Sequence, residues 1–299
     1  GMESCLLFTT GFLSNQGVIP TLLGRGEYLL TDKDNHASIV AGTLIAKAMG
    51  AEVLRYPSND MEALERMLAK LPLDAPKLIV SDGVFSMSGY VVNLPDLVRL
   101  AKTYQARLML DEAHSLGVLG DNGIGTASHF GLVNGEDVDL LMGTFSKSFA
   151  SLGGFIAGKH KVVDFIRHTS QALIFSASMA PANVAAVQAA LRIVRREPER
   201  VARINEIAEI MRRGFRELGF KIIDGGTPII PVIIGDDLKT FRFWHRLIEE
   251  GVFANAVVSP AVPQGMQLIR TSYIATLSNE QLNRILDVFG KLGREFGLI

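Results

Sequence analysis

The sequence predicts an α/β protein with a large domain built on a mainly parallel sheet and a smaller α+β domain after it. Short apolar runs alternate with helical patterns over roughly the first 150 residues, which is typical of a doubly wound α/β domain. The run Lys77–Ser81 shows no polar alternation, as expected of a strand buried on both faces of a parallel sheet. The pair Glu197–Pro198 then interrupts the pattern, and longer helices follow.

The elements of the large domain are predicted in chain order. Strands are expected at Gly26–Thr31, Ala51–Tyr56, Lys77–Ser81, Arg107–Leu110 and Val138–Met142, and a further apolar run covers Phe155–Ala157. Helices are expected from Gly11 toward Pro20, from Asp34 to Met49, after Ser58–Asp60, at Leu94–Tyr104 and at Ala180–Arg196. Asp34 or Asn35 suits the N-cap of the second helix because a short polar side chain accepts a hydrogen bond from a free amide.

The smaller domain is predicted to contain three helices and three strands. The helices are Glu199–Leu218, Leu238–Glu250 and Asn279–Phe296, and the strands are Ile229–Ile234, Val252–Val258 and Gln267–Tyr273. We therefore expect a large domain at residues 1–195 and a small C-terminal domain at residues 196–299.

The composition argues against several classes of protein. Of the 299 residues, 48% are hydrophobic and 20% are charged, and the net charge is -1, so the charge balance gives no reason to expect a nucleic-acid partner. Cys5 is the single cysteine, which rules out an intramolecular disulfide and fits a reducing cytoplasm. No apolar run reaches the roughly 20 residues of a bilayer span, so no transmembrane segment is expected.

Polar side chains follow successive strands of the predicted large domain. They are His36, Ser86, Asp111, His114 and Lys147. Because ligands of open α/β sheets bind at the carboxyl ends of the strands, one cleft could collect all five. A single polar residue after a strand is easily explained as a solvent-exposed surface residue. Five polar residues at the same sheet edge are hard to explain in this way.

The turn after Met142 presents a lysine in a Gly-rich surround. Lys147 stands near the hydroxyls of Thr144 and Ser146, and a lysine held there suits a nucleophilic amine that forms a Schiff base with a carbonyl. The competing interpretation is an ordinary solvent-exposed lysine on a connecting loop.

Asp111 and His114 suit recognition of a protonated pyridine ring and its phenolic oxygen. A carboxylate–histidine metal pair is the alternative, but no second cluster of ligands stands at a useful spacing, so no metal is predicted. The run Asp111–His114 also spells the helicase DEAH label, although no phosphate-binding Gly-x-x-x-x-Gly-Lys-Ser/Thr loop precedes it.

Three further positions fit a ligand site. The free amides after Gly11 form a natural phosphate site if a helix begins there, although a plain strand-to-helix turn has the same sequence. The imidazole of His36 can stack on a ring or lie on the surface. Arg270 lies in an apolar predicted strand, where a guanidinium clamps a carboxylate or reaches solvent from an edge.

Six ordered motifs together resemble the α-oxoamine synthases, which are pyridoxal-phosphate enzymes with the aspartate-aminotransferase fold (fold type I). The motifs are Gly11–Phe12, Asn35–Ser38, Asp82–Gly89, Asp111–Gly117, Gly143–Lys147 and Ile269–Ser272. The resemblance extends from Gly1 to Ile299 without large gaps.

The resemblance implies catalytic roles at four positions. Lys147 would be the Schiff-base lysine of pyridoxal 5'-phosphate, Asp111 would pair with the pyridine nitrogen, and His36 would stack on the ring. His114 would approach the phenolic oxygen, where Ser86 would also bind.

The resemblance also implies binding roles around the cofactor. Gly11, Phe12 and Thr144 would hold the phosphate side. Ser176 and Ala177 resemble the segment that reaches the cofactor of a partner subunit, which implies a homodimer with shared active sites. Arg270 resembles the clamp for the substrate carboxylate.

The implied reaction is a decarboxylative Claisen condensation of an amino acid, serine or glycine, with an acyl-CoA. The run Phe145–Phe155 most resembles serine palmitoyltransferase, which makes sphingolipid precursors, whereas Asp82–Met87 leans toward glycine C-acetyltransferase. The synthase of 8-amino-7-oxononanoate is a further alternative, and a non-catalytic partner subunit is the alternative of another class, against which the presence of Lys147 argues.

Two departures from the family pattern carry expectations. Relatives normally have a substantial segment before the position that matches Gly1, so we expect a truncated chain that binds the cofactor poorly. Leu277–Ser278 follows Thr276 where many relatives have His-Thr, so the acyl-chain length does not carry over.

Overall fold

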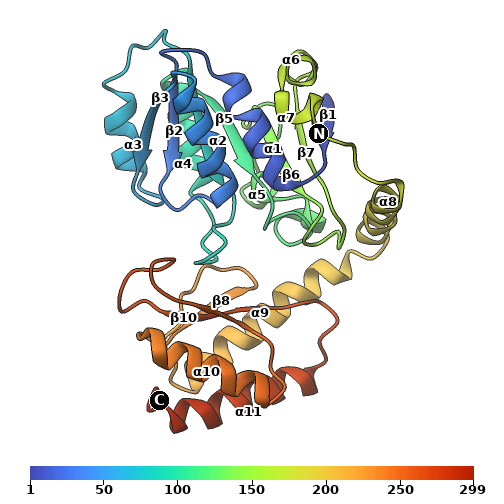
Figure 1. Cartoon of the computed structure of the whole chain (residues 1–299). Helices are drawn as coiled ribbons and strands as arrows, with labels where there is room; N and C mark the ends of the chain where they lie inside the picture. The colour runs from blue at the N-terminus through green and yellow to red at the C-terminus, as the bar shows by residue number, and fades with distance from the viewer. The chain divides into compact units, whose positions relative to one another are not determined.

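The computed structural model describes residues 1–299 and divides into two compact units (Figure 1). The first unit contains Gly1–Phe85 and Val92–Glu197, and the second contains Ser86–Val91 and Pro198–Ile299. The short segment Ser86–Val91 therefore belongs to a different unit from the residues on either side of it. No helix in residues 1–299 combines the length and the apolar character needed to cross a membrane.

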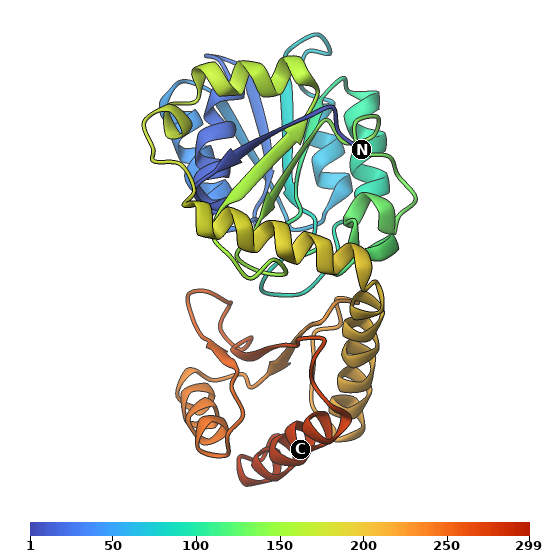
Figure 2. The same ribbon diagram turned by 90° about the vertical axis from the view of Figure 1, so that its right-hand side faces the viewer.

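The first unit is built on a seven-stranded sheet in the order β1-β7-β6-β5-β4-β2-β3. The strands are β1 (Ser4–Phe8), β2 (Tyr28–Asp32), β3 (Glu52–Tyr56), β4 (Lys77–Asp82), β5 (Arg107–Asp111), β6 (Leu140–Thr144) and β7 (Gly154–Gly158). Strands β2 to β6 run parallel, whereas β7 is antiparallel to both β6 and β1. Figure 2 shows β1, in dark blue, beside the yellow-green β7.

Helices cover both faces of this sheet because the buried strands are apolar on both sides. The helices are α1 (Gly11–Val18), α2 (Ala37–Ala48), α3 (Met61–Leu68), α4 (Leu94–Thr103), α5 (Thr126–His129), α6 (His160–Thr169), α7 (Gln171–Ile174) and α8 (Pro181–Arg196). Neighbouring residues divide between two cores: Leu30 and Ile79 pack with α3 and α4, while Leu29 and Val80 pack with α1, α2 and α6. This alternation with a period of two sets the sheet between the helical layers.

The second unit contains a three-stranded antiparallel sheet and three long helices. The strands β8 (Ile229–Ile233), β10 (Leu268–Ser272) and β9 (Asn255–Val257) pair in that order. The helices α9 (Glu199–Glu217), α10 (Asp237–Glu249) and α11 (Asn279–Glu295) bury Phe215, Phe243 and Phe289 against them. Helix α11 begins with a capping box of Ser278 and Gln281.

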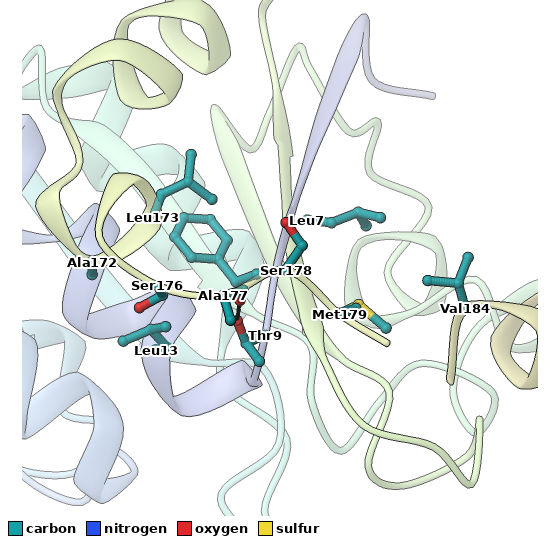
Figure 3. A pocket seen from close by; sticks show the side chains of 11 residues that line it. Leu7, Thr9, Leu13, Ala172, Leu173, Ser176, Ala177, Ser178, Met179 and Val184 are labelled. Carbon is teal, nitrogen blue, oxygen red and sulfur yellow. Dashed lines mark hydrogen bonds between the residues drawn. The ribbon is translucent and has the colours of Figure 1, made fainter. Parts of the chain in front are cut away.

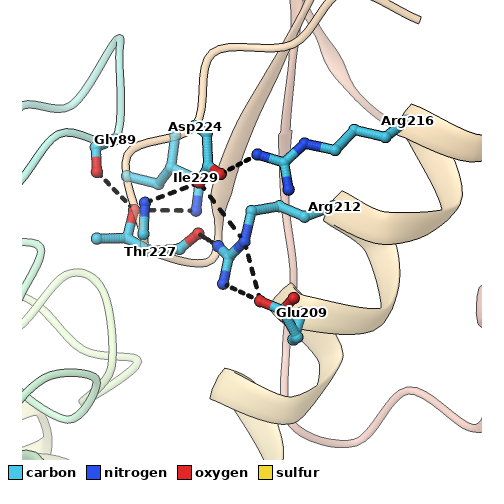
Figure 4. Close-up of polar contacts among 8 residues, drawn as sticks. Gly89, Glu209, Arg212, Arg216, Asp224, Thr227 and Ile229 are labelled. Carbon is cyan, nitrogen blue, oxygen red and sulfur yellow. Dashed lines mark hydrogen bonds and ion pairs between the residues drawn. The ribbon is translucent and has the colours of Figure 1, made fainter. Parts of the chain in front are cut away.

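Polar contacts attach the segment Ser86–Val91 to the second unit (Figure 4). The Thr227 hydroxyl donates to the Gly89 carbonyl at 2.9 Å, and the buried Arg212 donates through Nη1 to the Thr227 carbonyl at 2.8 Å. Arg212 also bonds Glu209 at 3.0 Å, and Asp224 pairs with Arg216. The buried Arg212 thus holds the loop around Thr227, which in turn binds the segment Ser86–Val91.

Several predicted boundaries were wrong, and β4 and β5 each end one residue later than predicted, at Asp82 and Asp111. The N-cap of α2 is His36 rather than Asp34 or Asn35, because its ring nitrogen accepts from the Ser38 amide. Strand β6 does not end before Gly143 but continues to Thr144, since both residues pair with β7. Strand β9 covers only Asn255–Val257 of the longer run predicted there, because its pairing with β10 ends at Asn255.

Candidate active site

The site of the first unit is built around Asp111, the last residue of β5. Its carboxylate is buried, with 2% of the residue exposed. Oδ1 accepts a hydrogen bond from the Ala113 amide at 2.9 Å, and Oδ2 accepts one from Asn15 Nδ2 at 2.8 Å. Burial raises the pKa of Asp111 above its usual range, and these two hydrogen bonds oppose that rise. Each oxygen keeps a lone pair for a further donor.

A second buried carboxylate lies on the neighbouring strand. Asp82 ends β4 and pairs in register with Asp111, and its Oδ2 accepts from the His36 amide at 2.8 Å. Burial, and then the negative charge of Asp111, raise the pKa of Asp82 well above its usual range. Asp82 therefore fixes the backbone at which α2 begins.

The Asn35 side chain also holds the start of α2, through three hydrogen bonds. Its Nδ2 donates to Thr31 Oγ1 and to the Val80 carbonyl, both at 2.9 Å, and its Oδ1 accepts from the Asp82 amide at 2.8 Å. The amide thereby joins the carboxyl ends of β2 and β4 and holds His36 at the sheet edge.

His36 presents its ring beside Phe12. The two ring centroids lie 6.5 Å apart in an edge-to-face arrangement, and Phe12 is 44% exposed. Partial burial lowers the pKa of His36; the Lys147 charge lowers it further, while the Asp111 charge opposes the change.

Lys147 stands three residues beyond β6. Its positive charge acts on Asp111, Asp82 and His36, so all three lie within electrostatic range of the lysine. The turn is held by the Phe145 amide on the Gly153 carbonyl at 2.9 Å, and by the Thr144 and Ser146 hydroxyls at 2.9 Å from each other. The lysine is therefore carried on a hydrogen-bonded turn of defined shape.

The start of α1 packs directly on the end of β6. A Cβ atom at Gly11 would lie 2.6 Å from Thr144 Oγ1, so only glycine allows this approach. Thr10 caps the helix through the Leu13 amide at 3.0 Å. The amides of Gly11 and Phe12 have no carbonyl of their own helix to bind, so the helix start offers backbone donors beside Thr144, whose own hydroxyl donates to the Gly153 carbonyl at 3.2 Å.

His114 and Glu112 follow Asp111 in the same turn. His114 lies three residues beyond β5 and is half-buried. Glu112 is buried and has a structural role, because it accepts hydrogen bonds from the Ser115 hydroxyl and from the amide and hydroxyl of Thr126. Its carboxylate closes the loop from Ser115 to Thr126, which holds the turn that carries His114.

The predicted residues Ser86 and Arg270 both belong to the second unit. Arg270 lies in β10 and donates through Nε to the Ser86 carbonyl at 2.6 Å. Burial lowers the pKa of Arg270 from its usual value. The Arg270 side chain and the Ser86 backbone are therefore in direct contact within the second unit.

Ser176 and Ala177 lie on an exposed loop between α7 and α8, where they line a pocket of 210 Å³ (Figure 3). Thr9 Oγ1 donates to the Ala177 carbonyl at 2.5 Å, and Leu7 and Leu13 form apolar walls. This pocket shares none of its lining residues with the group around Asp111.

Asn15 and Ser38 were not predicted as site residues, although Ser38 closes the motif Asn35–Ser38. Asn15 is fully buried and bridges Asp111 to Ser38 Oγ, at 2.8 and 2.9 Å. The available signal was spacing: Asn15 stands four residues after Gly11 and so faces the same side of α1. Its partner in β5 is 96 positions away, which helical spacing cannot predict.

Comparison with known proteins agrees with this architecture. The family model for aminotransferase class I and II matches residues 1–289. A serine palmitoyltransferase of Sphingobacterium spiritivorum is 46% identical over 287 residues, covering 96% of this chain and 71% of that protein. An 8-amino-7-oxononanoate synthase of Symbiobacterium thermophilum is 41% identical over 299 residues, covering all of this chain and 75% of that protein.

The solved structure of a Sphingomonas wittichii serine palmitoyltransferase superposes with a TM-score of 0.95 at 35% identity, over all of this chain and 74% of that one. The chain belongs to the α-oxoamine synthase family. Its fold is that of the class I and II aminotransferases, so the predicted fold class and family are confirmed.

The residues of this α-oxoamine synthase fit the pyridoxal phosphate with which a further serine palmitoyltransferase was solved. The spare lone pairs of the buried Asp111 suit a pyridinium N–H, whose charge would offset the raised pKa of the carboxyl. The corner of Gly11 and Thr144 is too close for any side chain and offers donors for a phosphate. Lys147 lies within electrostatic range of Asp111, as an amine for the aldehyde must.

Proposed function

We propose that the chain condenses L-serine with a long-chain acyl-CoA and releases CoA and carbon dioxide. The observation that carries the proposal is the grouping of Asp111, His36 and Lys147 at one sheet edge, in a chain 46% identical to a serine palmitoyltransferase. In the overall reaction one C–C bond forms, while the thioester and the bond to the substrate carboxylate break.

Pyridoxal phosphate, when bound, supplies an electron sink for the pair of electrons left at the α-carbon. Asp111 would keep the ring nitrogen protonated, which strengthens the sink. Lys147 Nζ would take the α-proton, and His36 would cover one ring face and exclude water. Gly11, Phe12 and Thr144 would hold the phosphate, with His114 and Ser86 at the phenolic oxygen.

The second unit is proposed to supply the substrate carboxylate clamp. Arg270 Nε is engaged by Ser86, which leaves the outer guanidinium nitrogens for a bidentate contact with a carboxylate. On this proposal residues 1–195 form the cofactor domain and residues 196–299 the small domain.

We also propose a homodimer with shared sites, in the cytoplasm. Helix α8 buries none of its residues and Phe175 is 84% exposed, so this region offers apolar surface to a second copy. Ser176 and Ala177, in the adjoining loop, would then reach the partner's cofactor. The single, exposed Cys5 and an acyl-CoA substrate suit a reducing compartment.

A second candidate is the 8-amino-7-oxononanoate synthase reaction. Relatives of that name reach 41% identity over the whole chain, close to the values for serine palmitoyltransferases. The same residues would act on a different amino acid and thioester, because the chemistry at the α-carbon is shared.

An assay of free CoA release tests these alternatives with the cofactor at saturation. L-serine, L-alanine and glycine are each combined with palmitoyl-CoA, pimeloyl-CoA and acetyl-CoA. The proposal predicts the highest kcat/KM for L-serine with palmitoyl-CoA. A preference for alanine with pimeloyl-CoA would support the second candidate, and no CoA release from any pair, with Lys147→Ala indistinguishable from the unchanged chain, would support a non-catalytic subunit.

A further inference from the structure

A chain of hydrogen bonds joins Asp111 to the imidazole of His36. Asn15 Nδ2 donates to Asp111 Oδ2 at 2.8 Å and to Ser38 Oγ at 2.9 Å, and Ser38 Oγ lies 2.7 Å from His36 Nδ1. Asn15 and Ser38 are buried, so no solvent competes for these contacts. The contacts connect α1, β5 and α2 at the site proposed for the cofactor.

The direction of each hydrogen bond follows from Asp111. A carboxylate only accepts, so the Asn15 amide must turn Nδ2 toward it; the reverse orientation would set two oxygens 2.8 Å apart. Asn15 Oδ1 is correspondingly left without a partner. The amide could satisfy this oxygen only by turning over, which would break the hydrogen bond to Asp111. The orientation of Asn15 is therefore set by the charge at position 111.

Ser38 passes this direction on to His36. Its Oγ accepts from Asn15, and its own proton has His36 Nδ1 as acceptor at 2.7 Å. The Ser38 amide also donates to Nδ1, at 3.2 Å, as the N-cap contact of α2. Two donors converge on Nδ1, so this nitrogen carries no proton and the ring proton is on Nε2.

We propose that Asn15 and Ser38 are positioning residues that hold His36 as the neutral Nε2–H tautomer. The Asp111 carboxylate sets the direction of the hydrogen bonds that connect it to His36. Protonation of Nδ1 would set an N–H against the Ser38 amide and remove the cap of α2. The ring is thus oriented from one side, and Nε2–H is its one N–H donor. The catalytic meaning of this donor rests on the proposed function, but the tautomer is a property of the chain alone.

Nitrogen-15 NMR of the imidazoles tests the tautomer directly, because protonated and unprotonated ring nitrogens resonate far apart. The chain is studied at pH 8 without added ligand, and the His36 signals are assigned by their loss in His36→Gln. We expect Nδ1 at the unprotonated limit and Nε2 at the protonated limit. In Ser38→Ala, Nδ1 should move toward the protonated limit as the Nδ1–H form becomes populated.

Thr43→Val is the matched control, since Thr43 is a buried hydroxyl of the same helix outside the network. It should leave both His36 nitrogens unchanged. If Ser38→Ala loses a dispersed amide spectrum, Asn15→Ala takes its place with the same expected shift. Nδ1 protonated in the unchanged chain, or a variant spectrum identical to that of Thr43→Val, would overturn the proposal. Because no substrate or cofactor is present, this result is independent of the CoA assay.

Discussion

Asp82 and Asp111 occupy paired positions at the ends of two neighbouring parallel strands, and both carboxyl groups are buried. Two such groups cannot both ionise without cost, because each raises the energy of the other's charge. The Lys147 charge lowers the pKa of both, and Asp111 in addition receives a side-chain hydrogen bond from Asn15. The pair is consequently asymmetric, with Asp111 the better stabilised anion.

Asp82→Asn should stabilise the cofactor-free chain at pH 8. The folded-state pKa of Asp82 is raised, so its contribution to stability is full below the unfolded-state pKa and is lost as the pH rises through the folded-state value. Asparagine keeps an oxygen for the His36 amide and carries no charge. We expect the Tm to rise by about 3 °C at pH 8 and the difference to shrink in acid.

Asp121→Asn, at an exposed turn position of the first unit, is the control for Asp82→Asn and should leave the Tm nearly unchanged at both pH values. The difference in Tm between Asp82→Asn and the unchanged chain should be larger at pH 8 than in acid. A smaller or negative difference at pH 8 would contradict this prediction.

Much of the sheet was predictable because its signal is local. Leu78–Val80 and Leu108–Leu110 are short apolar runs, so the positions of β4 and β5 were predictable, although each strand ends one residue later than predicted, at Asp82 and Asp111. The end of β6 was not, because Gly143 and Thr144 join the strand only through β7. Likewise, sequence patterns favour Asp or Asn as an N-cap, whereas His36 takes that place because Asp82 and Asn35 fix its backbone.

Gly11→Ala should weaken cofactor binding. The new Cβ would meet Thr144 Oγ1 at 2.6 Å and Thr144 Cβ at 2.7 Å, so α1 or the end of β6 must shift at the phosphate corner. We expect the Kd for pyridoxal phosphate to rise at least about tenfold, or ~1.4 kcal/mol. A titration followed by absorbance measures it, with Gly24→Ala as control, because its Cβ meets only the flexible end of Glu27. Equal Kd values for the two variants would show that Gly11 does not contribute to binding the phosphate.

Asn35→Ala should destabilise the first unit. The variant removes the side chain that binds the Asp82 amide and the Val80 carbonyl, and the Thr31 hydroxyl keeps only its long contact with the Asp32 carbonyl at 3.5 Å. Unsatisfied buried groups predict a loss of about 2–4 kcal/mol in unfolding free energy. Thermal unfolding checks this, and Asn59→Asp, which keeps a side-chain oxygen for the Asn93 amide, should cost much less.

Arg212→Met should loosen the loop that holds Ser86–Val91 in the second unit. Methionine fills similar space but removes the donors to the Thr227 carbonyl and Glu209. We expect a loss of about 2–3 kcal/mol in stability, with a higher KM for the amino acid and little change in kcat. The exposed neighbour Arg213→Met is the control. Matching values for the two variants would show that the network has no influence on substrate binding.

The site at which pyridoxal phosphate attaches to the chain decides whether Lys147 is the Schiff-base lysine. The chain is loaded with one equivalent of pyridoxal phosphate, reduced with borohydride and mapped by mass spectrometry, with Lys147→Arg treated alongside. We expect a single phosphopyridoxyl group on the peptide that contains Lys147, and none on the variant. A label on other lysines that persists in Lys147→Arg would contradict this expectation.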